Sequence, residues 1–541
     1  MPEEETEVIA PPRRRRARRA PARGPLRLFV GVALLLVGAG MFVVSGSYDT
    51  EQSAAVLGKP VNAPVNEGAD DPADISAHNS PSLVRNPTAA GNLVVADRID
   101  TPRFSCAVHV SVNGGSSWEQ KTVPAPEGER LCYAPDVAFD AEGTLYLSFV
   151  TLRGRANAPN AAWLVTSDDD GATFSDPVKV LEQKLPFQVR LAADPGRAGR
   201  LYVTWVQASE VGLYRFPEPG NPINAMRSDD GGDTWETPTR VSSADRERAV
   251  APSPVVGPDG TLHVVYLDLG EDSLDYEGGH EGRGGPAYDG MWELVHARSS
   301  DDGASWDEAV VEDELVPSER FIVFTPPFPS VAVDQESGNV YAAFHDQRLG
   351  DPDAWLWSLP EGAAGWQGPT RVNDTPEGDG TSQYLPKIGV APDGRVDVVY
   401  YDRRADPGDV SNEVSLQSSS EEGEGFGKRV RLSSEAFSSE IGYGSERDLP
   451  DLGSRLGIVS TDPRAFAVWT DTRAGTTGSN KQDIARAVVA FSDPPRLPDP
   501  VEYLLRYGGI ALVLIGLVAL AAPFVRSAGG VRRPRARSRQ S

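Results

Sequence analysis

The sequence predicts an all-β protein, a β-propeller of seven four-stranded blades with one apolar helix at each end. Three observations support this prediction. The 541-residue chain carries 54 Gly and 45 Pro, spread along its length, which fits short strands joined by turns. An eight-residue motif recurs at spacings of 56 to 71 residues, the range of one blade with its loops. An uncharged apolar run lies on each side of the repeats.

Composition and charge exclude several classes of protein. A hydrophobic content of 39% with 10 Trp provides ample apolar surface to bury, which argues against wholesale disorder. The formal net charge of −26 argues against nucleic acid as the partner. Only 2 Cys and 6 His are present, without paired spacing. We therefore expect neither a metal site nor a cofactor.

Both ends of the chain are expected to lie in the cytoplasm. Residues 1–27 carry eight Arg and residues 526–541 carry six, and each basic tail adjoins an apolar run. The runs at 28–45 and 507–525 reach the lower length limit for a transmembrane helix, and the adjoining Arg orient both tails inward. The membrane is thus the expected partner, contacted through two helices. A cleaved signal peptide is the alternative for the first run, because small residues follow it.

The remaining residues are expected to lie outside the cytoplasm, at a cell membrane that we expect to be bacterial. The predicted order is a linker at 46–58, the propeller at 59–495 and a second linker at 496–506. Seven pairs of strands can be counted along the propeller, and the last unit lacks its outermost strand. We expect residues 59–65 to supply that strand by pairing with 483–491, although a merged unit would leave six blades.

The repeated motif reads Ser-x-Asp-x-Gly-x-x-Trp or Phe. Ser and Asp side chains can hydrogen-bond within a tight turn, Gly permits the backbone geometry, and the aromatic ring can pack between sheets. Two of the five copies replace Asp with Asn or Glu, and a further copy near 358–366 has decayed. The motif residues are Ser111, Asn113, Gly115, Trp118, Ser167, Asp169, Gly171, Phe174, Ser228, Asp230, Gly232, Trp235, Ser299, Asp301, Gly303, Trp306, Ser419, Glu421, Gly423 and Phe426.

This motif resembles the BNR or Asp-box repeat of the sialidase-like β-propellers, over nearly all of the region between the apolar runs. The resemblance implies that each box joins the third and fourth strands of a blade, away from the functional face. The Asp runs could instead be taken for metal ligands. We interpret them as folding elements, because the same turn recurs in each unit.

The two cysteines are expected to form a disulfide. In the predicted layout Cys106 begins the third strand of the first unit and Cys132 precedes the first strand of the second. Loops at these two places emerge on the same face of a propeller, which we call the top face, so the pair is within reach. An extracytoplasmic location favours oxidation, and two free buried thiols are the alternative.

Arginine recurs where the second strands reach the top face. Three strands end in an aromatic residue followed by x-Asp-x-Arg, and Arg98 and Arg153 lie at comparable places in the first two units. Guanidinium groups suit carboxylate, sulfate or phosphate, so these side chains could converge on an anionic ligand. Each Arg could instead pair with its own Asp to hold a loop. The three motif pairs are Asp346 with Arg348, Asp402 with Arg404 and Asp471 with Arg473.

The resemblance to sialidases also implies catalytic residues, which match only in part. Those enzymes bind the sialate carboxylate through an Arg triad whose first member lies in a Phe-Arg-Ile-Pro signature, and they use a Glu-assisted Tyr nucleophile. Here the signature is absent, because Asn79 stands at the position of its Arg. Tyr443 with Glu446 is the best available Tyr and Glu pair.

Three functions remain open at this point. The first is a membrane-anchored extracytoplasmic propeller that binds a glycan, polymer or protein through its top face, with an anionic glycan or a surface protein as partner. The second is a sialidase-like glycoside hydrolase with a diverged site. The third is an assembly or scaffold factor at the membrane. The missing Arg signature and the seventh unit favour the first, and the fold alone decides nothing about activity.

Overall fold

The computed structural model divides the chain into two compact units, residues 53–492 and the two flanking segments 1–52 and 493–541. The described residues are 24–46, 53–57, 62–66, 75–154, 157–181, 185–210, 218–272, 288–318, 327–419, 422–445, 451–492 and 499–528.

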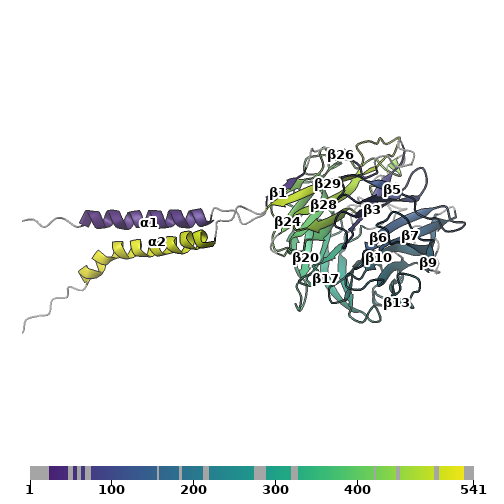
Figure 1. Ribbon diagram of the computed structural model, residues 1–541, viewed down its shortest axis with the longest axis horizontal. Coiled ribbons are helices and arrows are strands. Elements are labelled where there is room, and N and C mark those ends of the chain that lie inside the picture. The colour runs from purple at the N-terminus through teal and green to yellow at the C-terminus, as the bar shows by residue number, and fades with distance from the viewer. Residues whose placement is uncertain are drawn as a thin grey trace, which may run out of the picture. The chain divides into compact units, whose positions relative to one another are not determined.

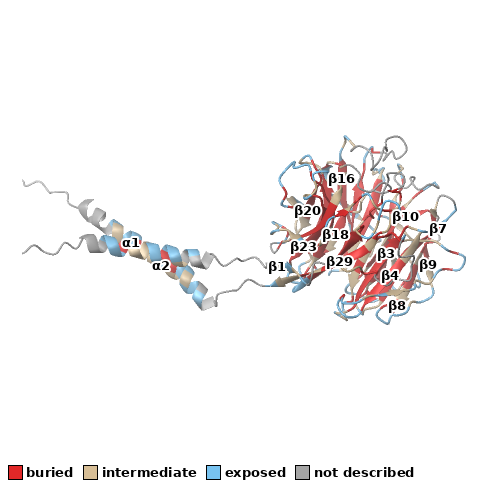
Figure 2. Ribbon diagram, turned by 90° about the horizontal axis from the view of Figure 1, so that it is seen from above, coloured by how far each residue is buried: buried red, intermediate tan, exposed pale blue. Residues whose placement is uncertain are grey.

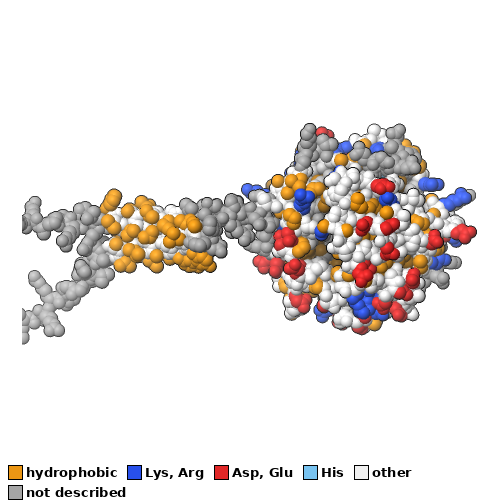
Figure 3. Space-filling view, viewed as in Figure 1, with side chains coloured by type: hydrophobic (Ala, Val, Ile, Leu, Met, Phe, Trp, Pro, Cys, Tyr) orange, Lys and Arg blue, Asp and Glu red, His pale blue; other side chains and the backbone are white. Residues whose placement is uncertain are grey.

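The flanking unit contains two helices, α1 (Gly24–Gly46) and α2 (Asp499–Ala528). Apolar side chains cover the described part of both helices (Figure 3). Among the described residues, one stretch of helix is long and apolar enough to cross a bilayer, the 19 residues Tyr503–Ala521 of α2, and the apolar part of α1 at Leu28–Met41 is shorter. One candidate span is therefore present, and the first span remains a prediction. The expected linker at 496–506 is helical from Asp499 onward.

Glycines allow α1 and α2 to approach each other closely. A Cβ added to Gly38 would lie 2.6 Å from the carbonyl oxygen of Gly509, and one added to Gly516 would lie 2.9 Å from that of Gly31. Gly31 lies against Gly516 and Gly38 lies against Gly509, so residue numbers rise along α1 as they fall along α2. The two helices are therefore antiparallel. Small residues at such crossings are typical of helices that associate in lipid.

The described part of residues 53–492 forms seven antiparallel sheets, each with four strands paired in series, so the prediction of seven blades is confirmed. Figure 1 shows the arrangement of these strands. The first strands of neighbouring blades contact one another all the way round, which closes them into a ring. In six of the sheets the remaining strands pair outward from this ring in chain order, and in the seventh the outermost strand comes from the N-terminal part of the chain. Side chains between the sheets are buried, as the red strands of Figure 2 show.

The first four blades follow one another along the chain. Their strands are β2 (His78–Arg85), β3 (Leu93–Ile99), β4 (Ser105–Ser111) and β5 (Glu119–Lys121); β6 (Cys132–Phe139), β7 (Leu145–Arg153), β8 (Ala158–Ser167) and β9 (Val178–Leu181); β10 (Pro186–Ala193), β11 (Leu201–Gln207), β12 (Ile223–Ser228) and β13 (Thr239–Arg240); and β14 (Ala249–Val256), β15 (Leu262–Asp268), β16 (Trp292–Ser299) and β17 (Asp307–Leu315).

The last three blades follow the same order, with one short additional strand. Their strands are β18 (Ser330–Val333), β19 (Val340–Asp346), β20 (Asp353–Leu359) and β21 (Gln367–Arg371); β22 (Gln383–Val390), β23 (Val396–Asp402), β24 (Ser411–Ser419) and β25 (Val430–Arg431), with β26 (Phe437–Ser438) beside β24; and β27 (Gly457–Thr461), β28 (Arg464–Asp471), β29 (Asp483–Ser492) and β1 (Ser53–Val56).

The seventh blade is completed by the N-terminal strand, but not by the residues expected. β1 pairs with β29 from Ser53 opposite Ser492 to Val56 opposite Val489. The prediction that 59–65 forms this strand was therefore wrong in position, and the propeller begins inside the expected linker. Ala54 and Val56 pack against the core beneath them, which sets the register. The described residues of 59–65 contact β29 through a bridge at Pro64, a hydrogen bond from the backbone N–H of Val65 and one from the Asn62 side chain, and they do not form a strand.

The Ser-x-Asp-x-Gly motif forms a turn between the third and fourth strands. In blade 3 the Ser228 hydroxyl donates to Asp230 Oδ1 (2.8 Å) and accepts from the backbone N–H of Gly232 (2.9 Å). Gly232 has φ +93°, and a Cβ there would lie 2.1 Å from Leu164 of the preceding blade. Trp235 packs into the core between the two blades. Equivalent bonds recur at Ser111, Ser167 and Ser299. Glu421 lies outside the described residues.

The Asp carboxylates of these turns accept hydrogen bonds from the turn itself. Those from the hydroxyl and backbone N–H of Thr173 lower the pKa of Asp169 to about 2, and those from Ser305 do the same for Asp301. Their role in the structure is therefore to hold the turn.

The predicted disulfide is confirmed, because Cys106 and Cys132 are bonded with their Cα atoms 5.5 Å apart. The bond joins β4 of blade 1 to β6 of blade 2 at the top face.

The inward face of β1 is expected to determine whether the ring closes. Val56→Asp places a charge against the core beneath β1 and should lower the free energy of unfolding by about 1–3 kcal/mol. Ala55→Asp is the matched control, because Ala55 is exposed on the same strand and its change should stay within about 0.5 kcal/mol. Urea unfolding of the full chain in detergent measures both values. Equal losses in the two variants would show that β1 is not needed for closure.

Candidate functional site

The three Asp-x-Arg motifs do not form a central anion site. Arg348 donates from Nε and Nη2 to Asp346 Oδ2 (2.8 and 2.6 Å), and its Nη2 also donates to Glu312 of β17 (3.0 Å). β17 is the outermost strand of the preceding blade. The guanidinium therefore points outward, where it also faces the ring of Trp355 at 5.0 Å.

The other two motifs repeat this arrangement. Arg404 donates to Asp402 (2.7 Å) and to Asp374, which follows β21 of the preceding blade (2.6 Å). Arg473 donates to Asp471 (2.9 Å), and Ser434 beyond β25 accepts from its Nη1. The prediction that these arginines converge on one funnel was therefore wrong. Each Arg joins its own Asp to the outer part of the neighbouring blade, which was the structural alternative.

The remaining arginines separate into two cases. Arg153 pairs with Glu129 and its side chain is 65% exposed, so it belongs to a surface contact. Arg98 is buried, and it lies at the centre of a polar cluster on the top face.

The Arg98 cluster joins residues from three blades. Arg98, in β3 of blade 1, donates from Nη2 to Asp100 (2.9 Å) and to Asp451 (2.6 Å). Its Nη1 donates to the Tyr133 hydroxyl (2.6 Å). Asp451 lies 353 residues away, in the segment that leads into blade 7, and Tyr133 is in β6 of blade 2. One guanidinium thus holds the seam where the last blade meets the first two.

Asn79 takes part in the same cluster. It stands opposite Arg98 in the β2–β3 pair, and its Nδ2 donates to Asp100 (2.8 Å) and to Gln482 (3.2 Å). The resemblance to sialidases implied an Arg at position 79. In this chain the guanidinium comes instead from the residue opposite, on the neighbouring strand.

Burial makes the electrostatics of this cluster unusual. It raises the pKa of Asp100 to about 6; the Arg98 charge opposes the rise and the charge of Asp451 adds to it. Burial by itself would lower the pKa of Arg98, but Asp100 and Asp451 raise it above its ordinary value, so the guanidinium stays charged. Both carboxylates are therefore held by one buried cation.

Aromatic side chains border the cluster. The Phe104 ring lies 5.4 Å from that of Tyr133 and 5.5 Å from that of Tyr443, between centroids. All three rings are half-buried. The structure thus places Tyr443 beside the Arg98 cluster, where its carbonyl accepts from the backbone N–H of Asp451 (2.9 Å). Its expected partner Glu446 lies outside the described residues.

The disulfide supports this aromatic border. Cys132 is adjacent to Tyr133, and Cys106 lies two residues after Phe104. The bond therefore fixes the segments that carry two of the three rings. Sequence reasoning named Arg98 and Tyr443 but missed Phe104, Asp100 and Asp451, because no spacing in the chain relates them.

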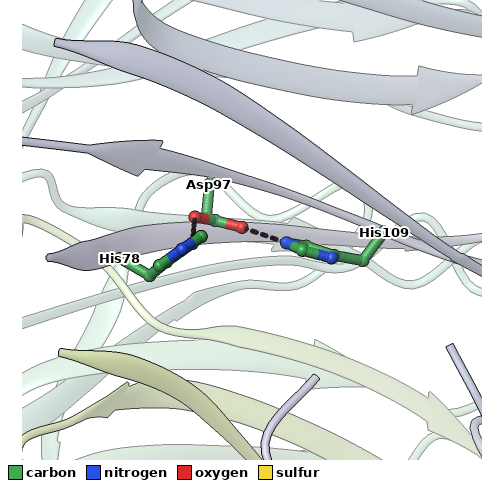
Figure 4. Close-up of side chains that lie close together, drawn as sticks. All are labelled: His78, Asp97 and His109. Atoms are coloured by element: carbon green, nitrogen blue, oxygen red, sulfur yellow. Dashed lines mark hydrogen bonds and ion pairs between the residues drawn. The ribbon is translucent and has the colours of Figure 1, made fainter. Parts of the chain in front are cut away.

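A second buried polar group lies in blade 1, next to Arg98 in sequence (Figure 4). Asp97 accepts from His78 Nδ1 (2.6 Å) and lies 2.9 Å from His109 Nε2. All three side chains are almost completely buried. Burial by itself would raise the pKa of Asp97, but the charge of His78 and hydrogen bonds from both rings lower it.

These three residues have the chemistry of metal ligands, but the two Asp97–His distances are those of a hydrogen bond and an ion pair. Each Asp97 oxygen faces a different imidazole, whereas a bound Zn²⁺ would hold one atom of each ligand about 2 Å from itself. We therefore interpret the group as a buried ionic bridge between β2, β3 and β4. The matching position of the other six blades carries an aromatic residue: Phe149, Trp205, Tyr266, Phe344, Tyr400 or Trp469.

Comparisons with known proteins yield fold neighbours only. No protein-family model and no characterised protein matches the chain by sequence. Solved structures that match include a protein of unknown function from Dyadobacter fermentans (12% identity, 77% of this chain and 96% of that one, TM-score 0.44), the Hadza microbial sialidase Hz136 (13%, 74% and 74%, 0.42), and the Penicillium chrysogenum α-L-arabinanase complexed with arabinobiose (16%, 68% and 98%, 0.42).

Removal of the central guanidinium should destabilise the top face. Arg98→Met leaves Asp100 and Asp451 buried without a cation and should cost about 3–5 kcal/mol of unfolding free energy. The triple variant Arg98→Met, Asp100→Asn, Asp451→Asn should recover part of this loss, because no buried charge then remains. Arg464→Met, at an exposed position of β28, is the control and should change stability by less than about 0.5 kcal/mol. Urea unfolding distinguishes the variants, and a triple variant less stable than Arg98→Met would contradict this account.

Proposed function

We propose that the chain is a membrane-anchored propeller that binds a glycan on the extracytoplasmic side through its top face. The observation that carries this proposal is the border of Phe104, Tyr133 and Tyr443 around the buried Arg98 cluster. The exposed parts of these half-buried rings offer apolar surface to the C–H groups of a sugar. The buried polar cluster holds two of the rings in place, through the Tyr133 hydroxyl and the backbone carbonyl of Tyr443.

The charge of the cluster favours a neutral sugar at this place. Arg98 carries one positive charge, while Asp100 and Asp451 carry two negative charges when both are ionised. An anionic sugar would therefore meet a net negative site here. We therefore propose a neutral glycan, and not an anionic one, as the ligand of the aromatic border.

A diverged glycoside hydrolase is the second candidate. One observation favours it, since Tyr443 lies beside Asp451 and close to the Arg98 cluster. Against it, both carboxylates of the cluster are buried and bonded to Arg98, whereas glycosidase carboxylates must reach the scissile bond. Binding without hydrolysis is therefore the better supported function, and a scaffold role is left for the case in which no glycan binds.

Anchoring in a membrane is supported by three features. The stretch Tyr503–Ala521 is long and apolar enough to span, and a segment with six Arg follows it. Glycines bring α1 and α2 into close contact, as in helix pairs within lipid. The disulfide fits an oxidising compartment outside the cytoplasm.

Glycan binding can be tested with the full chain in detergent on an array of neutral and acidic oligosaccharides. We expect a neutral glycan to bind and the variants Phe104→Ala and Tyr443→Ala to weaken it at least about tenfold, the loss typical of an aromatic contact at the centre of a site. Phe426→Ala is the matched control, because this half-buried ring lies in a turn away from the top face. Undiminished binding by both top-face variants would refute the proposed site.

The same preparation separates binding from hydrolysis. A fluorogenic sialoside should remain intact with the wild-type chain. Turnover that disappears in Tyr443→Phe would instead establish the second candidate.

The topology can be tested by cysteine labelling in intact cells, because the two native cysteines are bonded to each other. A cysteine placed at Ser116, an exposed residue of the propeller, should react with an impermeant maleimide. Cysteines at Ala10 and Ser538 should react only after the cells are permeabilised, because both tails are expected inside. Labelling of Ser538→Cys in intact cells would overturn this topology, and loss of the Ala10 label with a shorter chain would show that the first segment is cleaved.

A further inference from the structure

Charged side chains gather at the axis of the ring, in a place that neither the Asp turns nor the Arg98 cluster uses. The first strands of five blades share a register shift around a left-handed residue, Ser80, Ala134, Gln188, Ala251 or Leu385. The residue two positions later resumes the pairing, so it occupies the same level of the ring in each blade. These residues are Ser82, Asp136, Arg190, Ser253 and Lys387.

Arg190 extends across the ring. Its Nε lies 3.2 Å from Asp136 Oδ2 of the preceding blade. Its guanidinium carbon lies 5.3 Å from the centre of the Phe328 ring, just before β18, so the side chain passes blade 4 to reach blade 5. The side chain is only 13% exposed, and its buried Nη1 has no hydrogen-bond acceptor among the described residues. A buried guanidinium N–H without an acceptor is uncommon and requires an explanation.

Lys387, on the first strand of blade 6, is the second cation at this level. Within the described part of the chain its ammonium group makes neither a hydrogen bond nor an ion pair, and its side chain is half-buried. Burial and the Arg190 charge together lower the pKa of Lys387 to about 8, while the charge of Asp136 opposes this. Lys387 is therefore still mostly protonated at neutral pH. Its pKa responds to Asp136 of blade 2 and Arg190 of blade 3.

Positive charge exceeds negative charge among these residues. Asp136 is the one carboxylate of the set, and it already accepts from the Ser82 hydroxyl (2.6 Å) and the backbone N–H of Leu191 (3.0 Å). A third cation, Arg455, donates to the carbonyls of Ser80 and Pro135, which carry no charge. The named residues therefore include three cations and one carboxylate, inside a chain whose formal net charge is −26.

The geometry points to an oxyanion site on the propeller axis, between Arg190 and Lys387, for a group the size of a carboxylate or sulfate. An oxyanion would accept from the free Nη1 of Arg190 and offset the repulsion between the two cations, and a guanidinium matches such a group in shape and charge. The site is separate from the aromatic border around Arg98, since the two share no residue. Its ligand could be a free ion or a carboxylate carried by a sugar.

Isothermal titration of the full chain in non-ionic detergent, at an ionic strength held constant with sodium chloride, tests this site. The probes are sodium sulfate, sodium acetate and sodium glucuronate. We expect saturable binding of at least one probe and about tenfold weaker binding by Lys387→Met, which keeps the aliphatic part of the side chain but removes the charge. Binding of glucuronate at least as tight as that of acetate would identify a sugar carboxylate as the ligand, and binding of acetate or sulfate alone would identify a free ion.

Lys179→Met is the matched control, because it removes the same charge from an exposed outer strand and should leave the affinities unchanged. A second measurement needs no variant: crystals soaked in selenate should show anomalous density within hydrogen-bond distance of Arg190 Nη1 and Lys387 Nζ. The proposal fails if no probe binds saturably, if Lys387→Met and Lys179→Met bind alike, or if selenate occupies the surface only.

Discussion

Sheets that pack face to face in a series leave an open face at each end unless the last one meets the first. Here β1 pairs with β29, and the first strands of blades 7 and 1 contact each other, so the ring closes without a free end. Closure also fixes where the flanking segments begin, because Ser53 and Ser492 are opposite each other in the closing pair. The segments that lead to α1 and α2 therefore leave the propeller from adjacent residues.

The candidate glycan site depends on the same closure. Asp451 precedes blade 7, Arg98 belongs to blade 1 and Tyr133 to blade 2, so the guanidinium can bond its partners only when the ring is shut. The Cys106–Cys132 disulfide joins blade 1 to blade 2 covalently. The aromatic border is thereby held by a rigid frame, which lowers the entropy that a ligand must overcome on binding.

Blade 1 departs from the pattern of the other blades by burying an ionic group. Six blades bury an aromatic ring at the position where blade 1 buries Asp97 with His78 and His109. A buried ionic group is seldom more stabilising than well-packed apolar residues, so stability alone does not account for the exception. Blade 1 also carries Arg98 and Asp100, which concentrates buried charge at one seam of the ring. The axis shows the same tendency, with Arg190 and Lys387 at the same level of the ring in partly buried positions.

Local patterns were enough to predict the repeating parts of this protein. The Ser-x-Asp-x-Gly spacing predicted the turns, the count of strand pairs predicted seven blades, and the layout predicted the Cys106–Cys132 bond. Each of these follows from residues close in sequence or from a unit that repeats.

The closing strand was predicted at 59–65, whereas the structure forms it at 53–56. Either segment can adopt an extended conformation, and only the packing of Ala54 and Val56 on the core selects between them. The three Asp-x-Arg arginines were predicted to converge because their motif repeats at equivalent positions. The sequence does not give the direction in which each side chain points. The partners of Arg98 and the approach of Arg190 to Asp136 and Phe328 were decided by tertiary structure alone. A closed ring brings together residues from separate blades whose positions in the chain bear no relation to one another.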